Sequence, residues 1–159
     1  MTWTRIEIDL SAQHLLAFDA SGCTQFLCST ALRGAGEDEG SLQTPRGAHR
    51  IRARIGEGLD PLAVLVGRRP TGELWSPALS EASPERDWIL GRILWLCGED
   101  AGLNRGGSKD SQRRFIYIHG TPCSEPMGIP ASHGCIRLHP DAMVQVFDRT
   151  PVGCPVWIG

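Results

Sequence analysis

Two neighbouring stretches decide the fold and the chemistry of this chain: Phe115-Ile116-Tyr117-Ile118-His119-Gly120 and Ser132-His133-Gly134-Cys135-Ile136-Arg137-Leu138. The first is rich in β-branched and aromatic residues, which is typical of a strand, and His119 stands at its end. The second places a cysteine among basic side chains. A cysteine thiol needs a nearby base or positive charge to become a nucleophile. His119, His133, Arg137 and His139 are all candidates to activate Cys135, although a cysteine with nearby histidines is weak evidence of an enzyme by itself.

Plainer explanations exist for these residues taken singly. Cys135 alone could be a small buried apolar residue, and His119 alone could be a histidine that ends a strand. A zinc site could draw on His119, His133, Cys135 and His139. No familiar zinc spacing is present, however, and an activated thiol needs no metal. We therefore expect no metal and no other cofactor.

Around these stretches the pattern is mainly that of strands. Apolar and polar residues alternate over 6–10 and again over 14–19, a turn follows at 20–22, and a third strand is expected over 23–30. The first thirty residues therefore predict a β-meander. Further strands are expected over 48–55, 62–67 and 156–158, and 62–67 is so apolar that both of its faces should be buried.

Two helices and two loops complete the expected order of elements. Ser83-Pro84 is typical of a helix start, and apolar residues recur at helical spacing up to Cys97, so the longest helix is expected there. Pro140 should begin a short helix with Met143, Val144 and Phe147 on one face. Glycine-rich polar segments over 34–44 and 101–114 predict long loops. His49 and Trp3 are expected near the surface, and Trp157 in the core.

Length and charge restrict the kind of protein. The 159 residues fit one domain, 1–159, and 41% apolar residues suffice for one core. A formal net charge of -2 gives no basic surface for nucleic acid, which is not an expected partner. The sequence has no apolar run long enough to span a membrane and no export signal, so we expect a cytoplasmic protein, or a periplasmic one if a signal has been removed. The six cysteines are accordingly expected as free thiols.

Two more motifs give a resemblance to a known family. Thr44-Pro45-Arg46-Gly47 lies upstream, and the chain closes with the G-x-P-V-x-I strand of 153–158. With I-H-G and S-H-G-C-I-R-L, these motifs resemble in order the catalytic domain of L,D-transpeptidases, the YkuD family. The resemblance covers nearly the whole chain. It implies a mainly β fold with short helices, a mixed β-sandwich whose active site lies in a cleft at the rim.

The resemblance also implies the reaction. Cys135 would attack the carbonyl of an L-centred diamino acid in a peptidoglycan tetrapeptide stem, release the terminal D-alanine and form a thioester. His119 would take the thiol proton and return it to the leaving amine, with the backbone carbonyl of Gly120 orienting its imidazole. His133 would support the loop. The backbone amides of Gly134 and Cys135, together with that of His133, would stabilise the oxyanion.

Three further residues are candidates for the substrate side of the site. Arg137 is expected either to bind a substrate carboxylate or to brace the loop in an ion pair. Ser132 should hydrogen-bond the turn. Tyr117 faces either the cleft or the surface of the sheet.

The fate of the thioester is open at this stage. An acceptor amine would give a cross-link, and water would give L,D-carboxypeptidase activity. Because no export signal is seen, hydrolysis of soluble muropeptides in the cytosol is the more specific expectation. A peptidoglycan-binding module that has lost its chemistry is the non-enzyme alternative. Stem peptides or muropeptides are the expected partners, and the oligomeric state is not predicted.

Overall fold

The computed structural model describes residues 1–159 and contains ten strands, two α-helices and one short 3-10 helix. The elements are β1 (Arg5–Asp9), β2 (His14–Asp19), β3 (Gly22–Leu27), β4 (Gly47–Ile55), β5 (Ala63–Val66), β6 (Arg69–Leu74), α1 (Pro77–Ala82), β7 (Ile89–Gly98), η1 (Gly107–Lys109), β8 (Tyr117–Gly120), β9 (Ile136–Leu138), α2 (Pro140–Asp148) and β10 (Pro155–Ile158). No helix is both long enough and apolar enough to cross a lipid bilayer.

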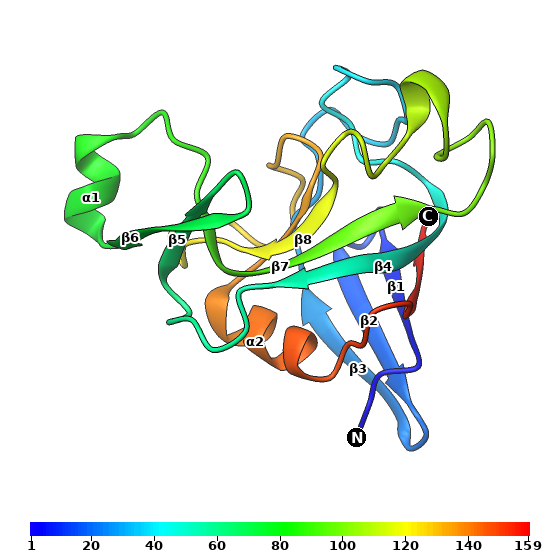
Figure 1. Ribbon diagram of the computed structural model, residues 1–159, viewed down its shortest axis with the longest axis horizontal. Helices are drawn as coiled ribbons and strands as arrows, with labels where there is room; N and C mark the ends of the chain where they lie inside the picture. The colour runs from blue at the N-terminus through cyan, green and yellow to red at the C-terminus, as the bar shows by residue number, and fades with distance from the viewer.

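All ten strands belong to one mixed sheet (Figure 1). Its order is β3-β2-β1-β10-β4-β7-β5-β6, with β8 paired to β7 and β9 paired to β8. Most pairs are antiparallel, but β1 runs parallel to β10 and β8 runs parallel to β9. The predicted meander is confirmed as β1, β2 and β3. The closing strand β10 lies between β1 and β4, so the two ends of the chain share one part of the sheet.

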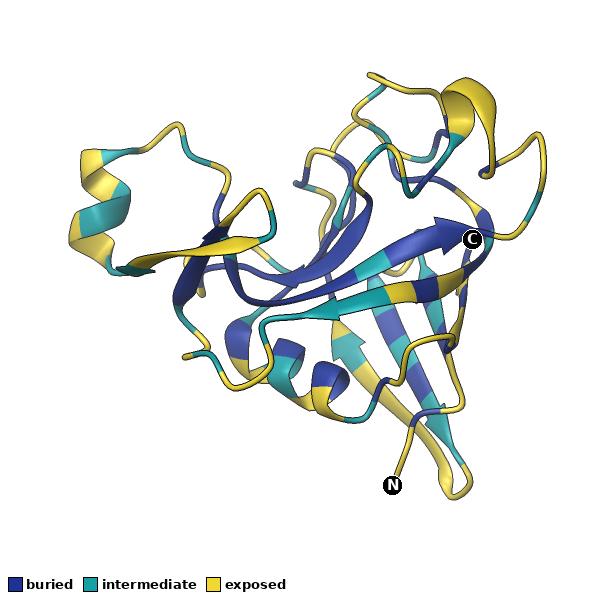
Figure 2. Cartoon of the chain, viewed as in Figure 1, coloured by how far each residue is buried: buried dark blue, intermediate teal, exposed yellow.

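One core joins the two halves of the sheet. It combines inward side chains of β1 and β10 with those of β7, β8 and β9 and with one face of α2. Figure 2 shows this as dark blue along β7 and β8, whereas β6 and α1 are mostly exposed. On α2 the buried residues are Pro140, Met143, Val146 and Phe147, so Val146 takes the place expected for Val144. The mainly β fold with short helices is thereby confirmed.

The helix expected over 84–97 is wrong. Residues Ile89 to Gly98 form β7, the strand at the centre of the sheet, which pairs with β4, β5 and β8. Nearly every residue of β7 is buried, and a run that is apolar on all sides fits a doubly covered strand as well as a helix. The actual helix α1 starts earlier, where Ser76 Oγ accepts the amide of Leu79 and Pro77 occupies the first turn.

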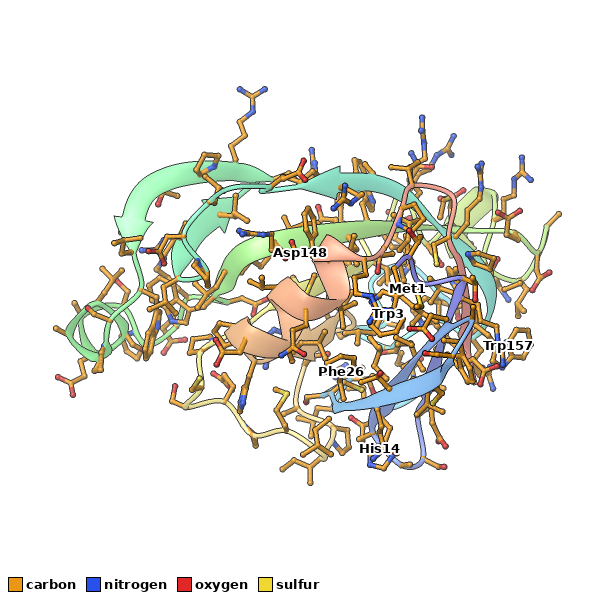
Figure 3. The ribbon with its side chains drawn as sticks, turned by 90° about the horizontal axis from the view of Figure 1, so that it is seen from below. Met1, Trp3, His14, Phe26, Asp148 and Trp157 are labelled. Carbon is orange, nitrogen blue, oxygen red and sulfur yellow. The ribbon has the colours of Figure 1, made fainter.

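Three single residues also differ from expectation. His49 is 2% exposed, and its ring bonds the Gly47 carbonyl at 3.0 Å and the Ser111 hydroxyl at 2.8 Å, tying β4 to the long loop. Trp3 is buried within the molecule and Trp157 projects from its edge (Figure 3). On a strand with one buried face, the even positions Val156 and Ile158 take the core side, which leaves Trp157 outside.

Candidate active site

The parallel pair β8 and β9 brings the predicted nucleophile and base together. Ile118 lies opposite Ile136, and both point into the core. Alternate residues of a strand share a face, so His119 and Arg137 lie on the opposite face from these isoleucines. Cys135, one residue before β9, occupies the same face as Arg137. Cys135 and His119 are thus diagonal neighbours across two adjacent strands, a spacing that side chains can bridge.

His119 is buried and held in one orientation. Its Nδ1 lies 2.8 Å from the carbonyl oxygen of Gly120, the contact expected from the sequence. Because a carbonyl can only accept, Nδ1 carries the proton and Nε2 is left as a free acceptor. The pKa of His119 is lowered, chiefly because burial disfavours the charged ring and also because Arg137 is close by. The hydrogen bond to Gly120 and the charge of Asp87 raise this pKa, but by less. The ring is therefore a neutral base at neutral pH.

Cys135 carries a protonated thiol in the free protein. Its Sγ lies 3.4 Å from the amide of Tyr117, which donates to it, and 3.4 Å from the carbonyl of Phe115, to which the thiol donates. Removal from water raises the pKa of this thiol to about 11, against the lowering effect of the Tyr117 amide and of the nearby arginines. No hydrogen bond joins Sγ to His119. Cys135 and His119 are consequently both neutral in the free protein.

The loop that presents Cys135 is held by two hydroxyl groups. Ser132 Oγ donates to the carbonyl of Cys135 at 2.6 Å and accepts the Gly134 amide at 3.2 Å. Thr44 Oγ1 donates to the carbonyl of Gly134 at 2.9 Å and accepts the amide of Ala31 at 3.0 Å. Thr44 of the T-P-R-G motif therefore helps to position the loop that carries Cys135. The sequence showed this motif but did not indicate its structural role.

Glycine at position 134 meets a steric need. Its φ is +133°, which side chains rarely adopt, and a Cβ there would lie 3.3 Å from the carbonyl oxygen of Gln43. The Gly134 amide is already engaged by Ser132, whereas the amides of His133 and Cys135 make no hydrogen bond. Of the three amides expected as oxyanion donors, those of His133 and Cys135 are therefore free and that of Gly134 is not.

Arg137 and Tyr117 have partners within the protein. The Arg137 side chain is 7% exposed, and Nη2 lies 2.9 Å from Asp87 Oδ1 while Nη1 lies 3.7 Å from Glu125 Oε2. The ion-pair alternative is thus the arrangement observed for Arg137. Tyr117 is buried, and its hydroxyl accepts a hydrogen bond from Arg68 at 3.1 Å.

Two hollows have lining residues within the 132–138 stretch that contains Cys135. A cleft of about 240 Å³ is lined by Cys135, Phe115, Arg114 and residues of the 34–44 loop, and a polar hollow of about 310 Å³ is lined by Asp87, Arg137 and Thr121 among others. His133 borders both. The largest hollow, about 430 Å³ beside Trp157, contains neither cysteine nor histidine, so the site lies at the smaller cleft.

One wall of the cleft depends on Arg114, which the sequence did not single out. Its guanidinium donates to the carbonyl of Gln43 at 2.7 Å and to that of Glu37 at 3.2 Å, and so joins the 34–44 loop to the end of the 101–114 loop. Both loops lack long regular elements, as expected, since only η1 interrupts them. Two segments far apart in the sequence therefore frame the thiol.

The structure contains no preformed cluster of metal ligands. No group of three or more histidine, cysteine, aspartate or glutamate side chains is arranged to hold an ion. All six cysteines are free, with Cys23 and Cys123 exposed, Cys135 half-buried and the other three buried.

Comparison with known sequences gives one family. The model of the L,D-transpeptidase catalytic domain, YkuD, matches residues 4–158. A putative L,D-transpeptidase of Bacillus subtilis, YqjB, is 43% identical over 51 residues, which cover 32% of this chain and 29% of that protein. The resemblance inferred from the motifs is confirmed.

Solved structures support the same fold. An L,D-transpeptidase from Xylanimonas cellulosilytica gives a TM-score of 0.57 at 22% identity, covering 99% of this chain and 61% of that one. One from Enterococcus faecium gives 0.59 at 16% identity, covering 100% and 50%. One from Mycobacterium smegmatis gives 0.55 at 21% identity, covering 97% and 57%. The chain therefore spans less than two thirds of each of these relatives.

Proposed function

Because the chain belongs to the family of L,D-transpeptidase catalytic domains, we propose that it cleaves peptidoglycan tetrapeptide stems through a thioester on Cys135. The observation that carries this proposal is the half-buried Cys135 thiol in a cleft, diagonal to an imidazole whose Nδ1 is held by the Gly120 carbonyl. That arrangement leaves Nε2 as the one free acceptor of the ring. It supplies a nucleophile and a base on two adjacent strands.

In the first half of the reaction, His119 Nε2 takes the proton of Cys135 as sulfur attacks the carbonyl of the L-centred residue. The oxyanion that forms is stabilised by the backbone amide of Cys135, which has no partner within the protein. The tetrahedral intermediate then collapses. The C–N bond to the terminal D-alanine breaks, His119 returns its proton to the leaving amine, and a thioester remains.

In the second half, an amine or a water molecule attacks the thioester carbonyl. His119 again accepts the proton of the attacking group and passes it to the departing sulfur. An acceptor amine gives a cross-linked peptide, and water gives a tripeptide stem. Both outcomes use the same residues, so transpeptidation and L,D-carboxypeptidase activity are alternatives of one mechanism.

Product analysis tests the proposal. The purified protein is incubated with a tetrapeptide muropeptide, and the products are identified by mass. We expect release of D-alanine with tripeptide, cross-linked dimer or both. Cys135→Ala should abolish release, whereas Cys123→Ala, which removes an exposed thiol of the neighbouring loop, should leave it intact.

Two results would contradict the proposal. Turnover retained in Cys135→Ala would refute the nucleophile. Binding of the muropeptide with no release of D-alanine, and no covalent adduct with a carbapenem, would instead identify a binding module without chemistry.

A further inference from the structure

Asp87, which lies outside every motif of the sequence, contacts His133 in the loop before β9 and Arg137 on β9. Its Oδ1 lies 2.9 Å from Arg137 Nη2, and its Oδ2 lies 3.6 Å from His133 Nδ1. Asp87 sits in the short segment between α1 and β7, and its own side chain is 45% exposed on the wall of the polar hollow. One carboxylate therefore bridges the two basic side chains on either side of Gly134 and Cys135.

The segment that bears Asp87 is firmly anchored. Trp88 is buried in a small cluster with Val64 and Leu90. Arg86 lies over the Trp88 ring with 4.2 Å between its guanidinium carbon and the ring centroid, and it forms a two-pronged ion pair with Glu73 at 2.9 and 3.1 Å. Neighbours on both sides hold the carboxylate of Asp87 in place.

Asp87 also provides the main negative charge for this part of the site. The titratable and charged groups around it come from four places: the imidazoles of His119 on β8 and of His133 in the loop before β9, and the guanidinium groups of Arg137 on β9 and of Arg86 on its own segment. Glu125 approaches Arg137 from the other side at 3.7 Å. Partial burial raises the pKa of Asp87, but the nearby basic groups lower it by more, so the carboxylate stays ionised.

We propose that Asp87 is a positioning residue for the reaction put forward above, on which this inference rests: it holds Arg137 and His133 beside Cys135 and keeps a negative charge near His119 while that ring carries the thiol proton. Without this charge, Arg137 would be a nearly buried cation whose remaining partners are the neutral Ala131 carbonyl at 3.3 Å and the Glu125 carboxylate at 3.7 Å. The imidazolium formed during catalysis would also face Arg137 without a counter-charge.

Asp87→Asn in the full chain tests the proposal, since it keeps the shape of the side chain and removes the charge. We expect kcat for D-alanine release to fall about five- to tenfold with KM nearly unchanged, because the loss concerns a charge that develops in the reaction. Asp87 raises the pKa of His119, so this pKa should be lower in the variant. The decline of kcat/KM at acidic pH, which reports protonation of the base, should therefore begin at a lower pH. Glu125→Gln is the matched control, because Glu125 lies near the same guanidinium of Arg137. In this variant, kcat and the pH dependence of kcat/KM should stay as in the wild type.

A measurement without substrate separates this inference from the proposed function. Asp87 also raises the pKa of the Cys135 thiol, so alkylation of Cys135 by iodoacetamide should shift to lower pH in Asp87→Asn. This shift is expected even if the muropeptide is not the substrate. A folded Asp87→Asn protein with the wild-type alkylation profile, or an equal shift in Glu125→Gln, would overturn the role of Asp87.

Asp87→Glu covers the case in which the Asn variant does not fold. It retains the charge, so the pH profiles should match the wild type, but the carboxylate is displaced by one methylene and kcat should fall about threefold. Wild-type kcat in this variant would show that the position of the carboxylate does not matter and would contradict the proposal.

Discussion

For single residues, burial decides how the Cys135 and His119 pair works. Burial disfavours the charged form of each group, so it raises the pKa of the thiol and lowers that of the imidazole. A preformed thiolate and imidazolium is therefore not the resting state. In the proposed reaction, His119 is therefore a general base whose proton acceptance coincides with attack, and the orientation fixed by the Gly120 carbonyl is consistent with this role.

The resting state can be tested by alkylation. The thiol pKa of about 11 means that the rate of reaction of Cys135 with iodoacetamide should keep rising by about tenfold per pH unit through pH 9. Because Cys23 and Cys123 are exposed, the rate must be followed on the peptide that contains Cys135. A plateau below pH 8 would show a preformed thiolate and contradict the neutral pair.

Thr44 is the second residue whose role can be tested alone. Thr44→Val keeps the shape but leaves the buried amide of Ala31 and carbonyl of Gly134 without their partner, which should lower the free energy of unfolding by about 2 kcal/mol. D-alanine release should also fall, because Gly134 precedes the nucleophile. Thr71→Val on the exposed strand β6 is the matched control. Equal stability of the two variants, measured by urea unfolding, would refute this role.

For the elements, local pattern predicted strands well where one face is buried. Alternation revealed β1 and β2, and the aromatic and β-branched run revealed β8, although β8 starts at Tyr117 because Phe115 has a positive φ of 56°. The pattern failed for β7, whose burial on both faces removes the alternation. Strand β6 was missed because its exposed residues include Pro70 and Gly72, which are uncommon in strands.

The site could be predicted only as far as its motifs extend. Cys135, His119, Gly120 and Ser132 belong to short motifs and were all named from the sequence. Asp87 and Arg114 reach the site through tertiary structure, from the segment before β7 and from the end of a polar loop. A single carboxylate or guanidinium in such a segment carries no local signal. The cytoplasmic location likewise stays a prediction.

At the scale of the whole molecule, two buried histidines link stability to pH. His49 and His119 both have lowered pKa values, chiefly because burial disfavours their charged forms. Below about pH 6.5 the unfolded chain binds protons that the folded protein resists, so the free energy of unfolding should fall as the pH drops. Protonation of His49 would also disturb its contact with Ser111, which ties β4 to the loop.

Urea unfolding at pH 7.5 and pH 5.5 measures this dependence. We expect a lower midpoint at pH 5.5, and a smaller difference between the two conditions in His49→Gln than in the wild type. Equal midpoints for the wild type at both pH values would show that the two rings are protonated to the same extent in the folded and unfolded states.

The most direct test of the whole account is to trap the acyl-enzyme. The protein is mixed with a tetrapeptide stem, quenched in acid within the first turnover, and analysed by intact mass and peptide mapping. The predicted result is a mass increase equal to the tripeptide less one water molecule, on the peptide that contains Cys135, and its loss on treatment with hydroxylamine. D-alanine release with no adduct on Cys135, or with the adduct on another residue, would contradict the central claim.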